Sequence, residues 1–228
     1  MELSKRMKIN ADLVAEGESL ADIGCDHAYA SIYLARGRKC PKIIAMDVVL
    51  GPLSQAKKNI KRYGLEDVIS CRLSDGLEKL SPGEVDTVLI AGMGGMLICQ
   101  ILTQYPQVTD SLKAMVLQAQ SDYEAVRKMV YSLGFIIEKE VFSTDNQKPY
   151  LAMRCIRGQE VEAYKEAEWA YGRMSCQEHP EEYKLYLKNK IRKLQDIRNK
   201  LLVEDSEKAQ IRAQELHQEV SYIQEVIS

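Results

Sequence analysis

The sequence lacks several patterns that would place it in other classes of protein. Its six cysteines include no C-x-x-C pair, so neither a zinc site nor a disulfide framework is predicted. No segment approaches the roughly 20 uninterrupted apolar residues of a membrane-spanning helix, and the N-terminus has no apolar signal core. The net charge of −2 over 228 residues indicates no particular partner. We therefore expect a reduced, cytoplasmic protein that binds neither a metal nor a membrane.

The turn after the first apolar strand lacks two of the three glycines of a dinucleotide-binding loop. Residues 20–28 read as a short strand that ends at Asp22, a turn at Gly24 and the start of a helix. A dinucleotide site needs G-x-G-x-x-G because a pyrophosphate sits against the helix N-terminus, but here Asp26 stands where that phosphate would lie. An acidic loop suits a ligand with ammonium and sulfonium groups, and S-adenosylmethionine carries both. A dehydrogenase is disfavoured, although an aspartate after a strand often only caps a helix.

Carboxylates also follow the next two expected strands. Asp47 ends the strand at 42–47, 23 residues after Gly24, and an acidic residue near this spacing accepts hydrogen bonds from ribose hydroxyls in nucleotide-binding βαβ units. The third strand, within 68–76, ends in Asp75 and Gly76, where the carboxylate can accept from the adenine amine and the glycine leaves room for the ring. Three such carboxylates in successive β-α repeats favour a cofactor site over ordinary loop chemistry.

Strands and helices alternate through the first part of the chain. Further strands are expected at 85–91, 113–118, 135–141 and 150–156, the last two joined as a hairpin around 144–146. Helices are expected at 4–15, 28–37, 52–63, 94–104 and 121–133. This alternation predicts an α/β fold with a doubly wound parallel sheet and an antiparallel edge. Such sheets bind ligands at the carboxyl ends of their strands, where the three aspartates fall.

The pattern becomes helical and charged near residue 158, so we expect domains at 1–158 and 159–228. Two long antiparallel helices, separated at 204–206, are predicted to pack as a short coiled coil. The expected apolar seam is Ile191, Leu194, Ile197, Leu201, Ile211, Leu216, Val220, Ile223 and Ile227. Residues 184–200 contain seven basic residues and one acidic residue. They form either an RNA phosphate-binding surface or a solvated face paired with the acidic second helix.

Five segments make the chain similar to a known family. They are DIGCDHAY at 22–29, GPLSQA at 51–56, LSDGL at 73–77, AGMGG at 91–95 and LQ at 117–118. In this order, and with a helical tail, they resemble the bacterial TrmK family, the S-adenosylmethionine-dependent tRNA (adenine-N1)-methyltransferases that act on adenine 22. The resemblance implies a class I methyltransferase fold, Rossmann-like with a seven-stranded sheet, a C-terminal helical coiled-coil domain and tRNA as partner. The chain departs from the family at Cys25, where serine is expected, and at 118–120, which reads Gln-Ala-Gln in place of Gln-Pro-Asn.

The resemblance implies methyl transfer to adenine N1, whose in-plane lone pair attacks without prior deprotonation. Because N1 lies on the Watson–Crick edge, the base must be unpaired or splayed out first. Methylation places positive charge on the ring, and a carboxylate facing it would stabilise that charge or take the N6 proton. We assign this catalytic role to Asp26. His27 either orients Asp26, touches the substrate, or is only a first-turn residue bonded to the backbone.

The other site residues are assigned to the cofactor and to the space for the base. Asp22 shapes the loop and holds the methionine amino group, and Cys25 is a small loop residue. Residues 92–95 replace the Asn/Asp-Pro-Pro-aromatic clamp of other amino-methyltransferases and leave room for the base, with Met93 against its ring. The predicted cofactor-binding residues are Asp22, Gly24, Cys25, Asp47, Val48, Asp75, Gly76, Gly92 and Met93.

Two other functions stay open. One is a small-molecule methyltransferase whose tail serves only to dimerise. The other is a non-enzymatic RNA-binding protein on a methyltransferase fold, although the intact Asp22, Gly24, Asp47 and Asp75 speak against a decayed site. We expect a monomer or a weak dimer.

Overall fold

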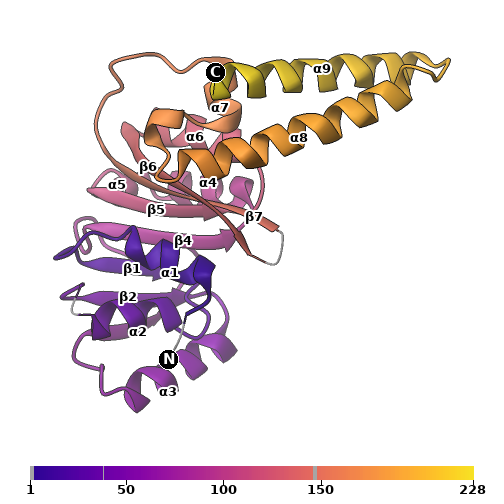
Figure 1. Ribbon diagram of the computed structural model, residues 1–228. Coiled ribbons are helices and arrows are strands. Elements are labelled where there is room, and N and C mark those ends of the chain that lie inside the picture. Colours follow the sequence, from indigo (N-terminus) through magenta and orange to yellow (C-terminus); the bar gives the residue numbers. More distant parts are fainter. Residues whose placement is uncertain (1–2, 38, 146–147) are drawn as a thin grey trace. The chain divides into compact units, whose positions relative to one another are not determined.

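The computed structural model describes residues 3–37, 39–145 and 148–228. The chain divides into two compact units, Met1–Glu160 and Val161–Ser228. The described strands of the sheet all belong to the first unit, and the second unit is built from helices (Figure 1).

The sheet of the first unit has seven strands in the order β3-β2-β1-β4-β5-β7-β6. The first five strands run parallel, and β7 lies antiparallel between β5 and β6. Every residue of β1, β2 and β5 is buried, as expected for parallel strands covered on both faces. The α/β sheet with an antiparallel edge that the sequence predicts is therefore confirmed. The strands are β1 (Leu20–Ile23), β2 (Ile43–Asp47), β3 (Ile69–Leu73), β4 (Thr87–Met93), β5 (Ala114–Ala119), β6 (Phe135–Asp145) and β7 (Lys148–Arg157).

The two antiparallel strands are longer than the sequence predicts. Phe142 and Ser143 are buried and pair with Leu151 and Tyr150, so β6 continues well beyond residue 141. The predicted turn at 144–146 is wrong for residues 144 and 145, which still pair with β7, and residue 146 lies outside the described residues. The fourth strand also differs, because it begins at Thr87 and continues to Met93.

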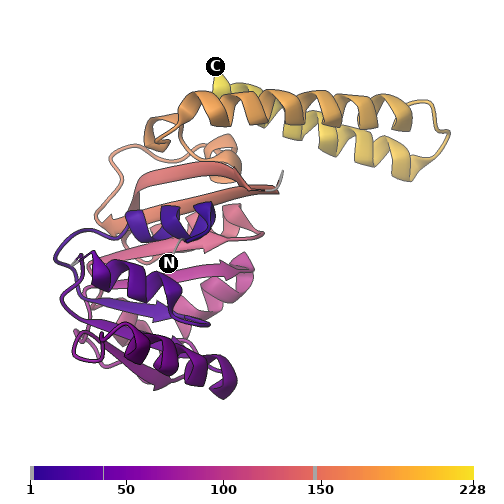
Figure 2. The ribbon, with the colours of Figure 1, turned by 60° about the horizontal axis from the view of Figure 1, so that its bottom comes forward.

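Helices cover both faces of the sheet. On one face lie α1 (Lys5–Asp12), α2 (Tyr29–Arg36) and α3 (Leu50–Arg62), and on the other lie α4 (Gly95–Gln104) and α6 (Tyr123–Ser132) (Figures 1 and 2). Pro52 falls in the first turn of α3, where its missing N–H costs no helical hydrogen bond. The short α5 (Pro106–Thr109), which begins at a proline, is not among the predicted helices.

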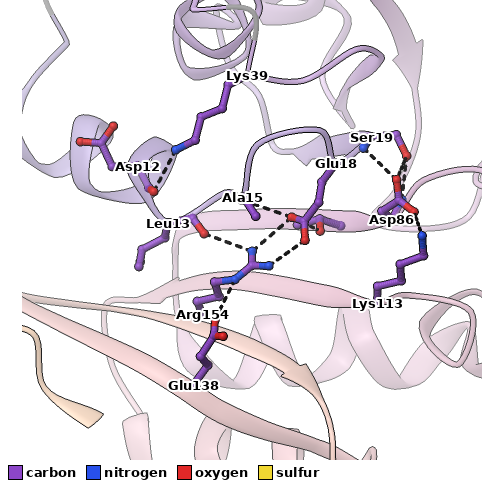
Figure 3. Close-up of polar contacts among 11 residues, drawn as sticks. Asp12, Leu13, Ala15, Glu18, Ser19, Lys39, Asp86, Lys113, Glu138 and Arg154 are labelled. Atoms are coloured by element: carbon purple, nitrogen blue, oxygen red, sulfur yellow. Dashed lines mark hydrogen bonds and ion pairs between the residues drawn. The ribbon is translucent and has the colours of Figure 1, made fainter.

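Helix α1 is shorter than predicted and is tied to the sheet at its C-terminus. Ser4 caps its first turn by accepting a hydrogen bond from the N–H of Met7. After the helix ends, the guanidinium of Arg154 donates to the Leu13 carbonyl at 3.1 Å and to both carboxylate oxygens of Glu18 at 2.7 and 3.1 Å (Figure 3). Glu18 also accepts from Thr87 at the start of β4. These charge-assisted hydrogen bonds fix the connection between α1 and β1 at the amino end of the strands.

The second unit contains α7 (Glu166–Tyr171), a 3₁₀ turn at Met174–Cys176, α8 (Pro180–Leu201) and α9 (Glu207–Ile227). The two long helices and the break between them are confirmed, and Ser206 caps α9 by accepting from the N–H of Ala209. Helix α7 is an addition to the predicted elements. Coiled-coil packing of α8 and α9 stays a prediction.

The buried side chains of α8 and α9 differ in part from the predicted seam. Ile197 and Ile211 are exposed. Ala209 and Ala213 are buried instead, and Ile211 lies about 200° around the helix from Ala209, so it faces outward. The buried set is Tyr183, Leu187, Leu194, Ala209, Ala213, Leu216, Val220 and Ile223.

Candidate active site

Four loops lie side by side along the carboxyl edge of the parallel strands. Because the strand order is β3-β2-β1-β4, the loops that carry Asp75, Asp47, Asp26 and Gly92 follow one another along this edge. Main-chain hydrogen bonds join neighbouring loops. The N–H of Ser74 donates to the Asp47 carbonyl at 3.0 Å, and the N–H groups of Gly24 and Cys25 both donate to the Met46 carbonyl.

The turn after β1 favours glycine at position 24. Gly24 has φ of +70°, and a Cβ placed on it would overlap the terminal methyl of Met93. Asp26 and Ala28, with φ of +50° and +59°, also lie in the left-handed region, which non-glycine residues adopt at a cost. Backbone strain is thus concentrated in the loop that the sequence assigns to the cofactor and to catalysis.

Asp47 ties this loop to the end of β2. Its Oδ2 accepts a hydrogen bond of 3.0 Å from the N–H of Asp26, and its Oδ1 accepts one of 2.8 Å from the N–H of Val49. An ionised carboxylate has about four lone-pair sites, so each oxygen can still accept from a ribose hydroxyl. The neighbouring Val48 is 62% exposed and is available to a ligand.

Asp22 is buried inside β1 beneath the same loop. Its Oδ2 accepts a hydrogen bond of 2.6 Å from the Ser31 hydroxyl. Burial raises the pKa of Asp22 to about 6, although the Ser31 hydrogen bond opposes the rise. Burial likewise raises the pKa of the Cys25 thiol, and the nearby carboxylates of Asp22 and Asp47 add to that rise. Cys25 is therefore a neutral loop residue and not a nucleophile.

Asp26 and His27 lie at the exposed end of the loop. The Asp26 side chain is 70% exposed, and its Oδ1 lies 3.6 Å from His27 Nε2, a separation too long for a strong hydrogen bond. The His27 carbonyl accepts from the Asn59 amide at 3.1 Å. Nδ1 of the His27 ring is buried without a hydrogen-bond partner in the part of the chain that the structure describes. His27 precedes Ala28, the N-cap residue of α2, so it does not lie in the first turn of that helix. The orphan Nδ1 leaves its ring available to a ligand.

A cavity of about 250 Å³ brings five of the predicted site residues together. Asp22, Gly24, Cys25, Asp26 and Gly92 line it. The predicted residues outside this lining are His27, Asp47, Val48, Asp75, Gly76 and Met93. Asp47 is linked to the cavity through its bond to Asp26, and Met93 borders it through its contact with Gly24.

Helix α1 adds three residues to the cavity that the sequence reasoning missed: Arg6, Met7 and Asn10. Arg6 and Asn10 are one helical turn apart and so share a face. The sequence signal that could have found them is the polar Asn10 among the apolar residues of this helix. In the structure the Asn10 side chain is buried, with 3% exposed. A buried amide on an apolar helix face indicates that it has a hydrogen-bond partner, which can be another segment of the chain or a ligand.

The glycine-rich segment 92–95 joins the end of β4 to α4 and reaches the cavity through Gly92. Gly92, with φ of +78°, makes a bulge in β4, and its N–H donates to Oε1 of the buried Gln118 at 3.1 Å. A Cβ at Gly95 would overlap the Ser121 carbonyl oxygen, so this glycine is required by packing. A Cβ at Gly92 would meet nothing nearer than Gln120 at 4.0 Å, so the space above Gly92 is open to a ligand.

The residues present fit S-adenosyl-L-methionine. The cavity combines two carboxylates, a glycine turn without side chain, and the amide of Asn10, whose Oδ1 has no partner among the described residues. A pyrophosphate would meet the carboxylates of Asp22 and Asp26, whereas an ammonium or sulfonium group is attracted by them. The same residues therefore disfavour a dinucleotide.

The described residues offer neither a metal site nor a membrane-spanning helix. Within residues 3–37, 39–145 and 148–228, no group of three or more His, Cys, Asp or Glu side chains is arranged to hold a metal ion. No helix in these ranges combines the length and apolar character needed to cross a membrane. The cytoplasmic location and the oligomeric state expected from the sequence stay predictions.

Comparison with known proteins identifies the class and then the family. Residues 3–153 match the methyltransferase domain family, so the chain is a class I methyltransferase with S-adenosyl-L-methionine as its cofactor. It is 34% identical to the Bacillus subtilis tRNA (adenine(22)-N(1))-methyltransferase over 164 residues, which are 72% of this chain and 69% of the relative. The chain therefore belongs to the TrmK family, which confirms the resemblance.

Solved structures agree with this assignment. The B. subtilis m1A22 tRNA methyltransferase TrmK has a TM-score of 0.84 and 28% identity, with 100% of this chain and 99% of that chain covered. M. capricolum TrmK in complex with the cofactor product S-adenosyl-homocysteine has a TM-score of 0.85 and 27% identity, with 100% of this chain and 98% of that chain covered.

Proposed function

We propose that this protein transfers the methyl group of S-adenosyl-L-methionine to N1 of adenine 22 in tRNA. The observation that carries the proposal is the position of Asp26, an exposed carboxylate in the wall of the acidic cavity of a TrmK-family chain. The proposal is supported by the open space at Gly92, which lines the same cavity and would leave room for an unpaired base.

The cofactor is held by the row of loops along the sheet edge. Asp47 would accept from the ribose hydroxyls through its free lone pairs, Asp75 would accept from the adenine amine, and Gly76 and Val48 would contact the adenine ring. Asp22 would accept from the methionine ammonium, and Gly24 and Cys25, which line the same cavity, would help to hold the amino-acid part. When bound, S-adenosyl-L-methionine supplies an electrophilic methyl group on its sulfonium.

Asp26 acts on the base. As N1 gains a bond, positive charge spreads over the adenine ring, and the Asp26 carboxylate stabilises that charge or takes the N6 proton. The hydrogen bond to Asp47 holds the left-handed backbone at residue 26, from which this carboxylate projects. His27 would orient Asp26 only if its ring moved closer than the 3.6 Å that separates Nε2 from Oδ1 in this structure.

The tRNA is proposed to contact α8 through its exposed basic side chains. Of the basic residues in 184–200, Lys190 pairs with Glu219 of α9 at 2.9 Å and donates to Tyr171 Oη at 3.1 Å. Lys184 lies 3.7 Å from Glu181 of its own helix. No ion pair of the described residues involves Lys188, Arg192, Lys193 or Lys200, and these four are exposed. Pairing with the acidic second helix therefore explains Lys190, whereas Lys188, Arg192, Lys193 and Lys200 remain available for phosphates.

Mapping of 1-methyladenosine tests the proposal. Unmodified tRNA is incubated with the protein and methyl-labelled S-adenosyl-L-methionine, and the modified position is read by mass spectrometry of nuclease fragments. We expect label at adenine 22 and none in a matched tRNA with guanine at that position. Cofactor binding without transfer to any tRNA would contradict the proposal, and it would favour either a small-molecule methyltransferase or a non-enzymatic RNA-binding protein.

A further inference from the structure

The loop after β5 is joined to the glycine-rich segment after β4. The backbone N–H of Gln120 donates a hydrogen bond of 2.9 Å to the Met93 carbonyl. A Cβ at Gly95 would overlap the Ser121 carbonyl oxygen, so the two segments are in close contact. The backbone at residue 120 is therefore held in a defined position beside the segment that contains Gly92.

The side chain of Gln120 lies at the open space beside Gly92. Gly92 lines the cavity together with Asp26, and a Cβ at Gly92 would have Nε2 of Gln120 as its nearest contact outside the adjoining residues, 4.0 Å away. Gln120 is exposed, although the six residues of β5 that precede it are all buried. An amide is thus presented to the space that the proposed function assigns to the unpaired base.

The other polar side chains of this loop are less suited to recognise a base. The exposed carboxylate of Asp122 accepts a hydrogen bond of 2.6 Å from the Ser121 hydroxyl, and an ionised carboxylate cannot donate. The amide of Gln118 is buried, and both of its ends are already bonded to the main chain, at 3.1 Å and 2.7 Å. Gln120 therefore offers this space a donor and an acceptor together.

The chemistry of the reaction leaves one edge of the adenine free for recognition. N1 must face the sulfonium methyl group, so the Watson–Crick edge of the ring is turned towards the cofactor. The N7 acceptor and one of the two hydrogens of the N6 amine lie on the Hoogsteen edge, which proteins also read in splayed-out bases. A side chain that selects adenine without blocking N1 must therefore bind N6 and N7.

An amide side chain has the donor and the acceptor that this edge requires. Its oxygen accepts from the N6 amine while its NH₂ group donates to N7, whereas guanine has two acceptors, O6 and N7, at the same places. We propose that Gln120 binds N6 and N7 of the target adenine and selects adenine against guanine. The proposal rests on the proposed methylation of tRNA, and it leaves the other hydrogen of N6 to Asp26.

The test combines a change in the protein with a change in the base. The substrates are tRNA with adenine at position 22 and tRNA with 7-deazaadenine there, in which a C–H group replaces N7. The variants of the full chain are Gln120→Met, which removes both polar atoms at similar length, and Gln120→Glu, which keeps an acceptor but loses the donor. Gln107→Met, at an exposed position of α5, is the matched control. Single-turnover methylation gives the second-order rate constant, and calorimetry gives the affinity for S-adenosylhomocysteine.

On adenine we expect Gln120→Met to lower the rate constant roughly ten- to a hundredfold, and Gln107→Met to leave it unchanged. Loss of N7 also alters the reactivity of N1, so the informative quantity is the ratio of the rate constants for adenine and 7-deazaadenine in each protein. This ratio should be roughly fivefold or more lower in Gln120→Met than in the parent, because the variant has no contact with N7 to lose. It should be lowest in Gln120→Glu, whose carboxylate is repelled by the lone pair of N7. Each variant should bind S-adenosylhomocysteine within about twofold of the parent, which shows that the cofactor site is intact.

Two results would overturn the inference while the proposed function stands. One is methylation of adenine 22 with the same ratio in Gln120→Met as in the parent, which would show that Gln120 does not read N7. The other is a loss of S-adenosylhomocysteine affinity in Gln120→Met as large as the loss of rate, which would assign Gln120 to the cofactor. A parent protein that methylates neither tRNA would instead overturn the proposed function, and the inference with it.

Discussion

The backbone N–H of Asp26 donates a hydrogen bond of 3.0 Å to Oδ2 of Asp47. The carboxylate proposed to hold the cofactor ribose therefore also positions the residue proposed to act on the adenine. Since the two aspartates are 21 residues apart on neighbouring loops, this bond couples cofactor binding to the geometry of catalysis.

Replacement of Asp47 should weaken the cofactor. Asp47→Ala removes the acceptor of the ribose hydroxyls and the anchor of the Asp26 loop, and a lost hydrogen bond to a charged group costs about 1.5–3 kcal/mol. We expect the affinity for S-adenosyl-L-methionine to fall about ten- to a hundredfold. Asp47→Asn keeps one acceptor oxygen and should lose less, while Asp67→Ala at an exposed position should lose nothing. Calorimetry with unchanged binding for Asp47→Ala would remove Asp47 from the site.

Replacement of Asp26 should affect turnover more than cofactor binding. We use Asp26→Asn first, because asparagine tolerates the left-handed backbone at this position. Stabilisation of developing charge acts in the transition state, so the single-turnover rate should fall roughly a hundred- to a thousandfold while cofactor affinity changes little. Quenched-flow methylation of tRNA gives the rate. A rate like that of the parent would mean that another group faces the adenine.

Asp22 makes cofactor binding depend on pH. Its raised pKa, about 6 in the folded protein, lies above the value near 3.9 of an unfolded chain. The folded protein therefore holds the Asp22 proton more tightly than the unfolded chain does. The resulting contribution to the free energy of unfolding is fully present below about pH 4 and is lost as the pH rises through about 6. Binding of an ammonium needs the ionised form, so affinity should be flat above about pH 6 and fall up to about tenfold per pH unit below it.

The control for this pH dependence is Asp22→Asn. It should bind S-adenosylhomocysteine more weakly and with an affinity that no longer changes across the pKa of Asp22. Calorimetry at several pH values between about 5 and 8 measures both proteins. A parent protein whose affinity is constant over this range would contradict the role of Asp22.

Loss of charge on α8 should reduce the salt dependence of tRNA binding. The variant carries glutamine at Lys188, Arg192, Lys193 and Lys200, and it leaves Lys190 unchanged because that residue pairs with Glu219. Each phosphate contact contributes about 0.7 to 0.9 to the slope of log affinity against log salt, so we expect the slope to fall by up to about 3. Fluorescence titration of labelled tRNA at several salt concentrations provides the measurement.

A matched variant tests whether this effect is local to α8. It carries glutamine at Lys57, Lys58, Lys61 and Arg62, four exposed basic residues of α3, and so makes the same change in net charge. We expect the slope of log affinity against log salt for this α3 variant to lie closer to that of the parent than the slope of the α8 variant does. Equal slopes for the parent and the α8 variant would show that the basic helix is only a solvated face.

The ion pair of Arg154 and Glu18 should contribute to the stability of the first unit. The side chains are 12% and 17% exposed, and removal of one partner from such a pair leaves an uncompensated charge. We expect Arg154→Met to lower the free energy of unfolding by about 3 kcal/mol. Thermal unfolding of both single variants and of the Glu18→Gln, Arg154→Met double variant gives the coupling energy. Additive effects within about 0.5 kcal/mol would show that the two residues act independently.

The sequence by itself determined the strand and helix order, the glycine turn at residue 24 and the row of aspartates at the carboxyl edge. These features are local, because hydrophobic periodicity and turn residues act over a few neighbouring positions. Once the strands are parallel and ordered, their carboxyl ends meet at one edge, so Asp26, Asp47 and Asp75 follow from the pattern.

Only the tertiary structure decided the contacts between distant segments. The entry of Arg6 and Asn10 into the cavity, the bond between Asp26 and Asp47, and the pairing of Lys190 with Glu219 each join separate elements. The turn expected at 144–146 was wrong for residues 144 and 145 because burial of Phe142 and Ser143 against β7 overrode the local signal of turn residues. Such contacts depend on how elements pack in three dimensions, which no periodicity along the chain records.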